Sequence, residues 1–300
     1  MTSRVGGRVG ASDITVSRPA GAAGRAALRA RHPGARGVVS PTMLGWSTNL
    51  FRVSGIQLSL HFSFYLLLGF NAWQGWREAG WAGLWWHSGV LVAFFVCVVL
   101  HELGHCFAAR RYGVGVSRIL LLPIGGVAEF DGIPREPQRE VVISLAGPAV
   151  NFVLAAVLWL VLRVLPASAP SADDLPNALP GLAGSLDFLL SWNLLMGTFN
   201  LVPAFPMDGG RVLRALLAGK MDYVRATFWA ATVGKVVAVA GAVGAYFHQP
   251  MAILLFLFVF IVGEMEYRGA RRRAEEEEHF RLTVERLRAQ SVAHGTRPPI

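Results

Sequence analysis

The stretch FVCVVLHELGHCFAARRYG, residues 95–113, places two histidines and a glutamate at the end of an apolar segment. Leu91–Leu100, which precedes the first histidine, carries no polar side chain except one cysteine thiol. Such a run is typical of a helix that crosses a lipid bilayer, where an ionisable side chain is costly. His101, Glu102 and His105 are therefore predicted to have a function at this depth.

The composition of the whole chain also indicates a membrane protein in contact with the lipid bilayer. Hydrophobic residues make up 53% of the 300 residues and charged residues only 16%, whereas a soluble domain carries about 25% charged residues. The net charge of +9 comes almost entirely from arginine, without the interleaved aromatic and basic residues typical of RNA or DNA binding, so no nucleic-acid partner is expected. Cys97 and Cys106 lie too far apart on one helix to predict a disulfide or a cysteine metal site.

Apolar stretches predict an all-α polytopic membrane protein with about six transmembrane helices. The predicted spans are Ile56–Trp73, Ser88–Ala109, Val141–Leu165, Leu186–Leu201, Ala226–Phe247 and Met251–Glu264. Arginines concentrate in the connections that follow the second, fourth and sixth spans, and the acidic pair Asp173 and Asp174 lies on the other side. Because positive loops stay inside, both termini are predicted to be cytoplasmic.

Residues 1–45 are predicted to be a basic, disordered N-terminal extension. They are rich in Arg, Ala, Gly and Ser and hold no apolar stretch long enough for a signal peptide. A genuine disordered tail, an organellar transit peptide and a misassigned start all stay open, and a true start at Met43 is favoured. Residues 46–267 are expected to form the membrane-embedded core, and residues 268–300 a charged cytoplasmic helical tail.

The spacing of the two histidines predicts a metal site. Residues four apart on a helix face the same side, so His101 and His105 lie one turn apart and can hold one small cation. Glu102 lies one step around the helix, close enough to reach a water on the ion. This H-E-x-x-H pattern is typical of zinc peptidases, in which the ion lowers the pKa of a bound water and the glutamate accepts its proton. A chance pattern on a structural helix is the alternative, which the apolar setting disfavours.

A catalytic zinc site needs a third protein ligand, and Asp208 in the sequence PMDGG is the foremost candidate. Pro203 and Pro206 predict a break in the helix, and Gly209 and Gly210 are expected to let the backbone turn. Broken helices are tolerated at membrane depth where they line a cavity. The alternative is that Asp208 is a solvated carboxylate that caps the following helix.

The segments HELGH and NLVPAFPMDGGR, in this order, resemble the two motifs of the site-2 protease family, zinc metalloproteases that cut within membranes. LLPIGGVAEFD and AGPAVNF also resemble segments of that family, and the resemblance covers roughly residues 50–265. It implies one Zn²⁺ per chain, bound by His101, His105 and Asp208, with Glu102 as the general base. It also implies a membrane-anchored regulatory protein as the substrate, and a cell membrane, most simply the bacterial inner membrane, as the location.

The resemblance implies further site residues. Asn200 is expected to face the zinc and donate a hydrogen bond to the developing oxyanion; the alternative is an amide that satisfies the broken helix. Gly125 and Gly126 are expected in a short membrane-associated β-hairpin between the second and third spans, whose edge can hold an extended substrate; the alternative is a plain surface loop. Asn151 is expected to bridge helices, and His61 to have at most an interface or gating role.

The chain departs from larger members of that family. Its connections are too short for a PDZ domain and its tail too short for paired CBS domains, so a minimal form is expected. A membrane zinc transporter and a pseudoprotease that binds membrane proteins without cutting them stay open as alternatives. A transporter usually has ionisable groups on several spans and internal repeats, and a pseudoprotease is expected to have lost Glu102 or a ligand. No feature of the sequence indicates an oligomeric state.

Overall fold

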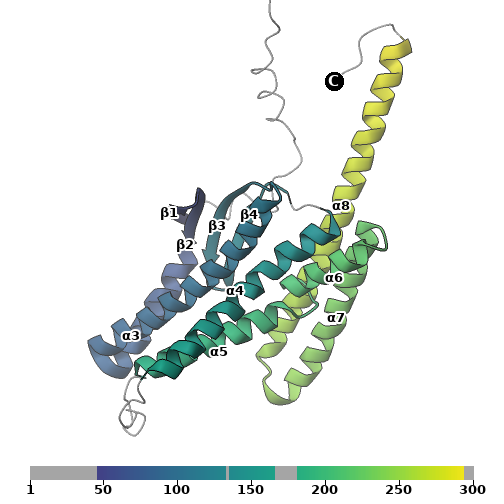
Figure 1. The fold of residues 1–300 in the computed structure, drawn as a ribbon. Coiled ribbons are helices and arrows are strands. Elements are labelled where there is room, and N and C mark those ends of the chain that lie inside the picture. The colour runs from purple at the N-terminus through teal and green to yellow at the C-terminus, as the bar shows by residue number, and fades with distance from the viewer. Residues whose placement is uncertain (1–45, 133–134, 166–180, 294–300) are drawn as a thin grey trace, which may run out of the picture. The chain divides into compact units, whose positions relative to one another are not determined.

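The computed structural model describes residues 46–132, 135–165 and 181–293, and within them it has four strands and six helices (Figure 1). The elements in chain order are β1 (Ser47–Val53), β2 (Ile56–His61), α3 (Phe62–Arg111), β3 (Val116–Leu122), β4 (Gly125–Phe130), α4 (Pro137–Val164), α5 (Leu182–Asn200), α6 (Asp208–Ala218), α7 (Tyr223–His248) and α8 (Ala252–Ala293). The predictions for residues 1–45 and for the loop at 166–180 lie outside the described residues. α8 runs through the predicted boundary at residues 267–268 without a break.

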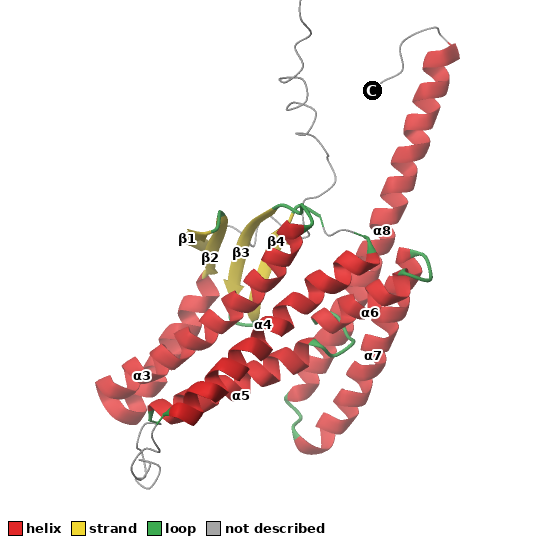
Figure 2. Ribbon diagram, in the orientation of Figure 1, coloured by secondary structure: helices red, strands yellow, loops and turns green. Residues whose placement is uncertain are grey.

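The four strands form one sheet in the order β1-β2-β3-β4. β1 pairs with β2 and β3 with β4 in antiparallel hairpins, whereas β2 and β3 are parallel, which the long crossover through α3 between them allows. A hairpin, β3–β4, thus lies where the sequence predicted one, but it is half of a larger sheet. Figure 2 shows this sheet beside one end of α3, and α3 contacts β2, β3 and β4.

The first predicted span, Ile56–Trp73, is wrong at its start, because residues 56–61 form β2. Apolar Ile56, Leu58 and Leu60 alternate with polar residues, which is the period of a strand rather than of a helix. All three side chains are buried against α3. The helix begins only at Phe62, after His61, whose side chain accepts a hydrogen bond from the backbone N–H of Ser63 and caps the first turn.

α3 consists of two arms, of which the first contains residues 62–73 of the first predicted span and the second contains the second predicted span. The backbone turns at Ala79 and Gly80, and Gly80 has φ +59°, a conformation that favours glycine. The two arms pack closely next to the turn, where Gly75 of one arm faces Gly83 of the other. A Cβ on either glycine would collide with the backbone of the other. Figure 1 shows the two arms folded back beside each other.

Three helices in the described part of the chain are long and apolar enough to cross a membrane: α3, α4 and residues 223–246 of α7. α5 carries Asp187 and two asparagines, Asn193 and Asn200, and the apolar part of α8 ends near Glu264. The chain therefore has the helices of a membrane protein, and the number of six spans stays a prediction.

α4 lies at the centre of the helix packing, in contact with α3, α5 and α6. α6 packs in turn on α7, and α7 on α8. The helix that carries HELGH and the helix that begins with Asp208 thus meet across α4, although about a hundred residues separate them.

Candidate metal centre

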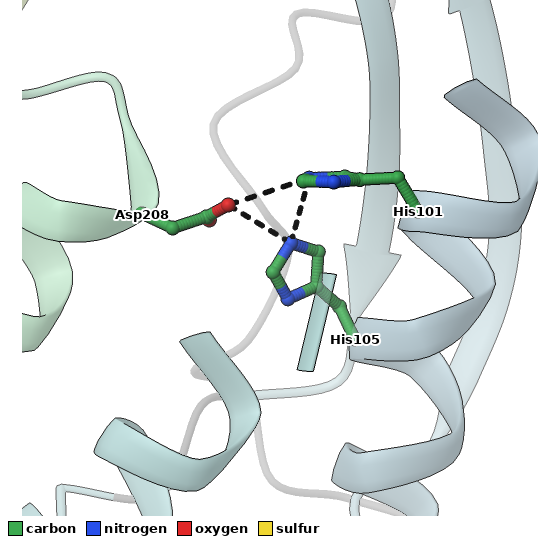
Figure 3. Close-up of side chains that lie close together, drawn as sticks. All are labelled: His101, His105 and Asp208. Carbon is green, nitrogen blue, oxygen red and sulfur yellow. Dashed lines mark hydrogen bonds and ion pairs between the residues drawn. The ribbon is translucent and has the colours of Figure 1, made fainter. Parts of the chain in front are cut away.

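Three ligand atoms from two distant parts of the chain meet in the interior (Figure 3). Nε2 of His101 and Nε2 of His105, both on α3, lie 3.1 Å apart. Oδ2 of Asp208, at the start of α6, lies 3.3 Å from the first and 3.2 Å from the second. The exposed fractions of these residues are 3%, 5% and 7% respectively, so the cluster is shielded from solvent.

The opposite nitrogen of each imidazole faces an acceptor. Nδ1 of His105 lies 2.7 Å from the carbonyl oxygen of Ile143 in α4, which can only accept a hydrogen bond. Nδ1 of His101 lies 2.5 Å from Oδ1 of Asn151, about two turns further along α4. A neutral imidazole that donates from Nδ1 carries a lone pair on Nε2, so both Nε2 atoms present lone pairs to Asp208.

This donor set fits a zinc ion. Three lone-pair donors face one another, and Oδ2 of Asp208 is buried without a hydrogen-bond partner, an arrangement that a cation stabilises. A tetrahedral zinc with bonds of 2.0–2.1 Å requires ligand atoms about 3.3 Å apart, close to the separations of 3.1–3.3 Å. Two imidazoles and one carboxylate leave a fourth position for water, as catalytic zinc sites do.

Asp208 reaches the centre because α6 begins unusually close to the segment before it. The residue is the first of α6, and it is buried rather than a solvated cap. The prediction that Gly209 and Gly210 provide a backbone turn is wrong, because both are helical and neither has a positive φ. They are needed for space: a Cβ on Gly209 would collide with the carbonyls of Leu201 and Val202, and one on Gly210 with the backbone of residues 204–205.

Gly147 of α4 gives the imidazoles their room. A Cβ at this position would collide with Nε2 of His105 and Cε1 of His101. The next residue, Pro148, has no backbone N–H, so this turn of α4 also lacks one helical hydrogen bond. The AGP sequence thus lets α4 pass directly beside the metal centre.

Glu102 follows His101 on α3, and β4 lies against its side chain. A Cβ on Gly126 would stand 2.5 Å from Cγ of Glu102, so only glycine fits between the strand and the carboxylate. Gly125 begins β4 with φ +139° and accommodates the tight β3–β4 connection. Gly126 therefore lies beside the candidate base, and the part of both glycines in substrate binding stays a prediction.

The remaining sequence candidates occupy different places. Asn200 is the last residue of α5 and is half-buried, and its part as an oxyanion donor stays a prediction. Asn151 bridges α4 and α5 as expected, but it also contacts His101. His61 caps α3 at the sheet, as part of an interface and not of the metal centre.

Sequence reasoning missed Asn193 and a buried ion cluster. Asn193 is 2% exposed in the middle of α5 and accepts a hydrogen bond from Asn151; an amide within an apolar helix was the available signal. Arg214 of α6 is also 2% exposed and binds Glu140 of α4 and Glu266 of α8. These pairs join distant parts of the sequence, so no local pattern reveals them.

Comparisons with known proteins agree with this geometry. Residues 89–179 and 177–241 match the sequence model named Peptidase family M50. The chain is 40% identical over 230 residues to "Zinc metalloprotease MJ0392" of Methanocaldococcus jannaschii, covering 75% of this chain and 62% of that protein. It is 26% identical over 141 residues to "Stage IV sporulation protein FB" of Bacillus subtilis, covering 47% of this chain and 44% of that protein. The chain thus spans less than two thirds of the length of these relatives.

A solved structure is also similar. "Site-2 Protease from Methanocaldococcus jannaschii" matches with a TM-score of 0.54 and 38% identity, over 74% of this chain and 95% of that one.

Proposed function

The chain belongs to peptidase family M50, the site-2 protease family, and from that membership we propose that it is an intramembrane zinc metalloendopeptidase. Its substrate is a membrane-anchored regulatory protein, which it hydrolyses in or near the transmembrane segment. The relatives named zinc metalloprotease support this activity, and the three apolar helices support its place in a membrane.

The observation that carries the proposal is the convergence of three ligand atoms, each within 3.3 Å of the other two, beside a glutamate. His101, His105 and Asp208 would hold one Zn²⁺, and the ion would supply the Lewis acidity that lowers the pKa of a water towards neutrality. Glu102 is the general base that would accept the proton of the attacking water and pass it to the leaving amine. A transporter needs ionisable groups along a path, whereas these groups lie at one depth.

Asn200 is proposed to donate its amide N–H to the oxyanion that forms at the scissile carbonyl. Its position at the end of α5, just before the segment that leads to Asp208, supports this role. Its half-buried side chain is accessible to a bound peptide.

β4 is proposed to hold the substrate in an extended form. A helical peptide bond is shielded, so the segment must unwind before attack, and an unpaired strand edge can bind it by β-augmentation. β4 is the last strand of the sheet and pairs only with β3 among the described strands. Gly126 lies against Glu102, so a peptide on this edge passes beside the base.

The charge asymmetry of the connections supports both termini in the cytoplasm and the metal centre near the cytoplasmic side. The prokaryotic relatives and the apolar composition of the chain support the bacterial inner membrane as the location. Residues 46–267 form the proposed catalytic core.

Metal dependence and cleavage are tested together on the purified full chain, with a test protein that carries one transmembrane helix. We expect a chelator to stop cleavage, added Zn²⁺ to restore it, and His105→Ala to lose both zinc and cleavage. His87→Ala is the matched control, because His87 lies on the same helix but pairs with Glu78. Cleavage that persists without metal, or a His105→Ala variant that keeps zinc and activity, would rule out the proposal.

A further inference from the structure

A chain of amide hydrogen bonds leads from the metal centre into α5. Nδ2 of Asn151 donates to Oδ1 of Asn193 over 2.9 Å, and Nδ2 of Asn193 donates to the carbonyl oxygen of Leu189 over 2.8 Å. Asn151 is 0% and Asn193 2% exposed, so water does not compete for these groups. Gly197, one turn further along α5, brings the helices together here, since a Cβ on it would lie 3.3 Å from Cβ of Asn151.

The far end of this series of hydrogen bonds, at Leu189, fixes which group donates and which accepts at each step. The carbonyl of Leu189 can only accept, so Asn193 must turn its Nδ2 towards it and its Oδ1 towards Asn151. Asn151 then donates from Nδ2 and has only Oδ1 left for His101. The reverse orientation of either amide would place two acceptors or two donors in contact, which is costly for buried polar groups.

From this geometry we infer that Asn193 is a positioning residue for the metal centre. Through Asn151 it holds the proton of His101 on Nδ1 and so leaves Nε2 free to bind the ion. His105 needs no such chain, because a backbone carbonyl, that of Ile143, faces its Nδ1 directly. The inference rests on the proposed metal site and adds that α5 controls its ligand chemistry.

Breaking this series of hydrogen bonds should change which nitrogen of His101 carries the proton. In Asn193→Leu, Asn151 loses the acceptor for its Nδ2 and can rotate to present that group to His101. His101 then accepts on Nδ1 and carries its proton on Nε2, where it blocks the metal. In Asn193→Asp, the buried carboxyl group in its neutral form donates its O–H to the carbonyl oxygen of Leu189 and still presents an oxygen to Asn151, so the direction of these hydrogen bonds is kept.

Zinc affinity, measured by competition with a chelator on the purified full chain, tests the inference without peptide cleavage. Loss of a group that orients a ligand typically weakens metal binding 10- to 100-fold, so we expect Asn193→Leu to bind Zn²⁺ at least tenfold more weakly. Asn193→Asp should stay within about threefold of the parent. Ser185→Ala is the matched control, because Ser185 is a buried polar residue of α5 whose hydroxyl has no hydrogen-bond partner.

A double variant separates positioning from a general effect on packing. If Asn193 acts through Asn151, Asn151→Leu combined with Asn193→Leu should bind Zn²⁺ as Asn151→Leu does alone. Multiplication of the two single losses would overturn the inference, as would a loss below tenfold in Asn193→Leu.

The tautomer itself is read from ¹⁵N NMR of histidine-labelled, zinc-free protein, with the His101 signal assigned by its absence in His101→Ala. We expect the proton on Nδ1 in the parent and in Asn193→Asp, and on Nε2 in Asn193→Leu. A parent with the proton on Nε2 would overturn the inference even if Asn193→Leu does not fold. If the parent shows the expected tautomer and binds zinc but cleaves nothing, the proposed function fails and the positioning role stands.

Discussion

Gly126 shows how one missing side chain shapes the candidate site at the scale of a residue. A Cβ there would stand 2.5 Å from Cγ of Glu102, so any larger residue must displace either β4 or the carboxylate. The candidate metal ligands lie on α3 and α6, whereas the atoms nearest to a Cβ on Gly126 all belong to Glu102. A substitution in β4 can therefore change the cleavage rate without changing metal binding.

We accordingly predict that Gly126→Ala lowers the cleavage rate at least tenfold, since misplacing a catalytic group by about 1 Å can cost 10²-fold. Zinc content should stay at that of the parent. Both are measured on the same preparation, as turnover of a transmembrane test protein and as metal per chain. Val127→Ala, an exposed neighbour on the same strand, is the control, and full activity in Gly126→Ala would contradict close contact between β4 and the base.

At the scale of elements, α6 is held in place by a buried ion cluster. Nε of Arg214 lies 2.8 Å from Oε1 of Glu140 on α4, and Nη1 lies 2.7 Å from Oε1 of Glu266 on α8. The guanidinium also packs over the rings of Phe205 and Tyr223. Because Asp208 begins the same helix, this cluster holds the helix from which the third candidate ligand reaches the two histidines.

We predict that Arg214→Met lowers the free energy of unfolding by about 3–5 kcal/mol, because it leaves the buried Glu140 carboxylate without its partner. Addition of Glu140→Gln should recover most of the loss, since it removes the unpaired charge. Denaturant unfolding in detergent, with zinc chelated, gives both values. Arg268→Met is the control, because Arg268 is exposed and pairs with Glu264 one turn away. An equal, small loss of stability in both arginine variants would contradict a stabilising role of the buried ion cluster.

The exposed end of α8 has a separate anchor. Arg135, just before α4, donates hydrogen bonds of 2.8 and 2.6 Å to the two carboxylate oxygens of Glu277. This contact lowers the pKa of Glu277 below its usual range. A carboxyl group with a lowered pKa in the folded state stabilises that state above its unfolded pKa, and the contribution disappears as the pH falls through the folded pKa.

Glu277→Gln should therefore loosen α8 at neutral pH but have no effect once the parent carboxyl group is protonated. We expect faster amide hydrogen exchange in residues 271–293 of the variant than of the parent at pH 7, and equal exchange well below pH 4, near which a free glutamate titrates. Glu285→Gln is the control, as its partner Arg281 lies 4.0 Å away. A difference between variant and parent that is independent of pH would exclude this anchor.

At the scale of the whole molecule, the sequence predicted what is encoded locally. H-E-x-x-H needs only one helix to bring its histidines together, and the apolar runs mark α3, α4 and α7 directly. β2 was missed because residues 56–61 continue into an apolar helix, which hid their alternation, and β1 was missed because its sequence STNLFRV does not alternate. An amide within an apolar helix marked Asn193, but the partners of Asn193 and Arg214 on α4 could not be found, because only the folded chain brings α4 against both of their helices.

The orientation in the membrane is the prediction that belongs to the whole chain. The arginine distribution predicts that a reporter fused at Asp174 lies on the opposite side of the membrane from one fused at the C-terminus. Paired fusions of a phosphatase, active outside, and a fluorescent protein, active inside, measure this directly. The same side for both positions would mean that the number of spans between them is not odd.

Glu102→Gln gives the most direct test of the central claim, that a zinc-bound water is activated by Glu102. Glutamine keeps the size of the side chain and its packing against β4, but it cannot accept the proton. We predict a variant that still binds one zinc per chain with near-parental affinity and whose cleavage of a transmembrane test protein falls below detection. A Glu102→Gln variant that cleaves at close to the parental rate would contradict the account.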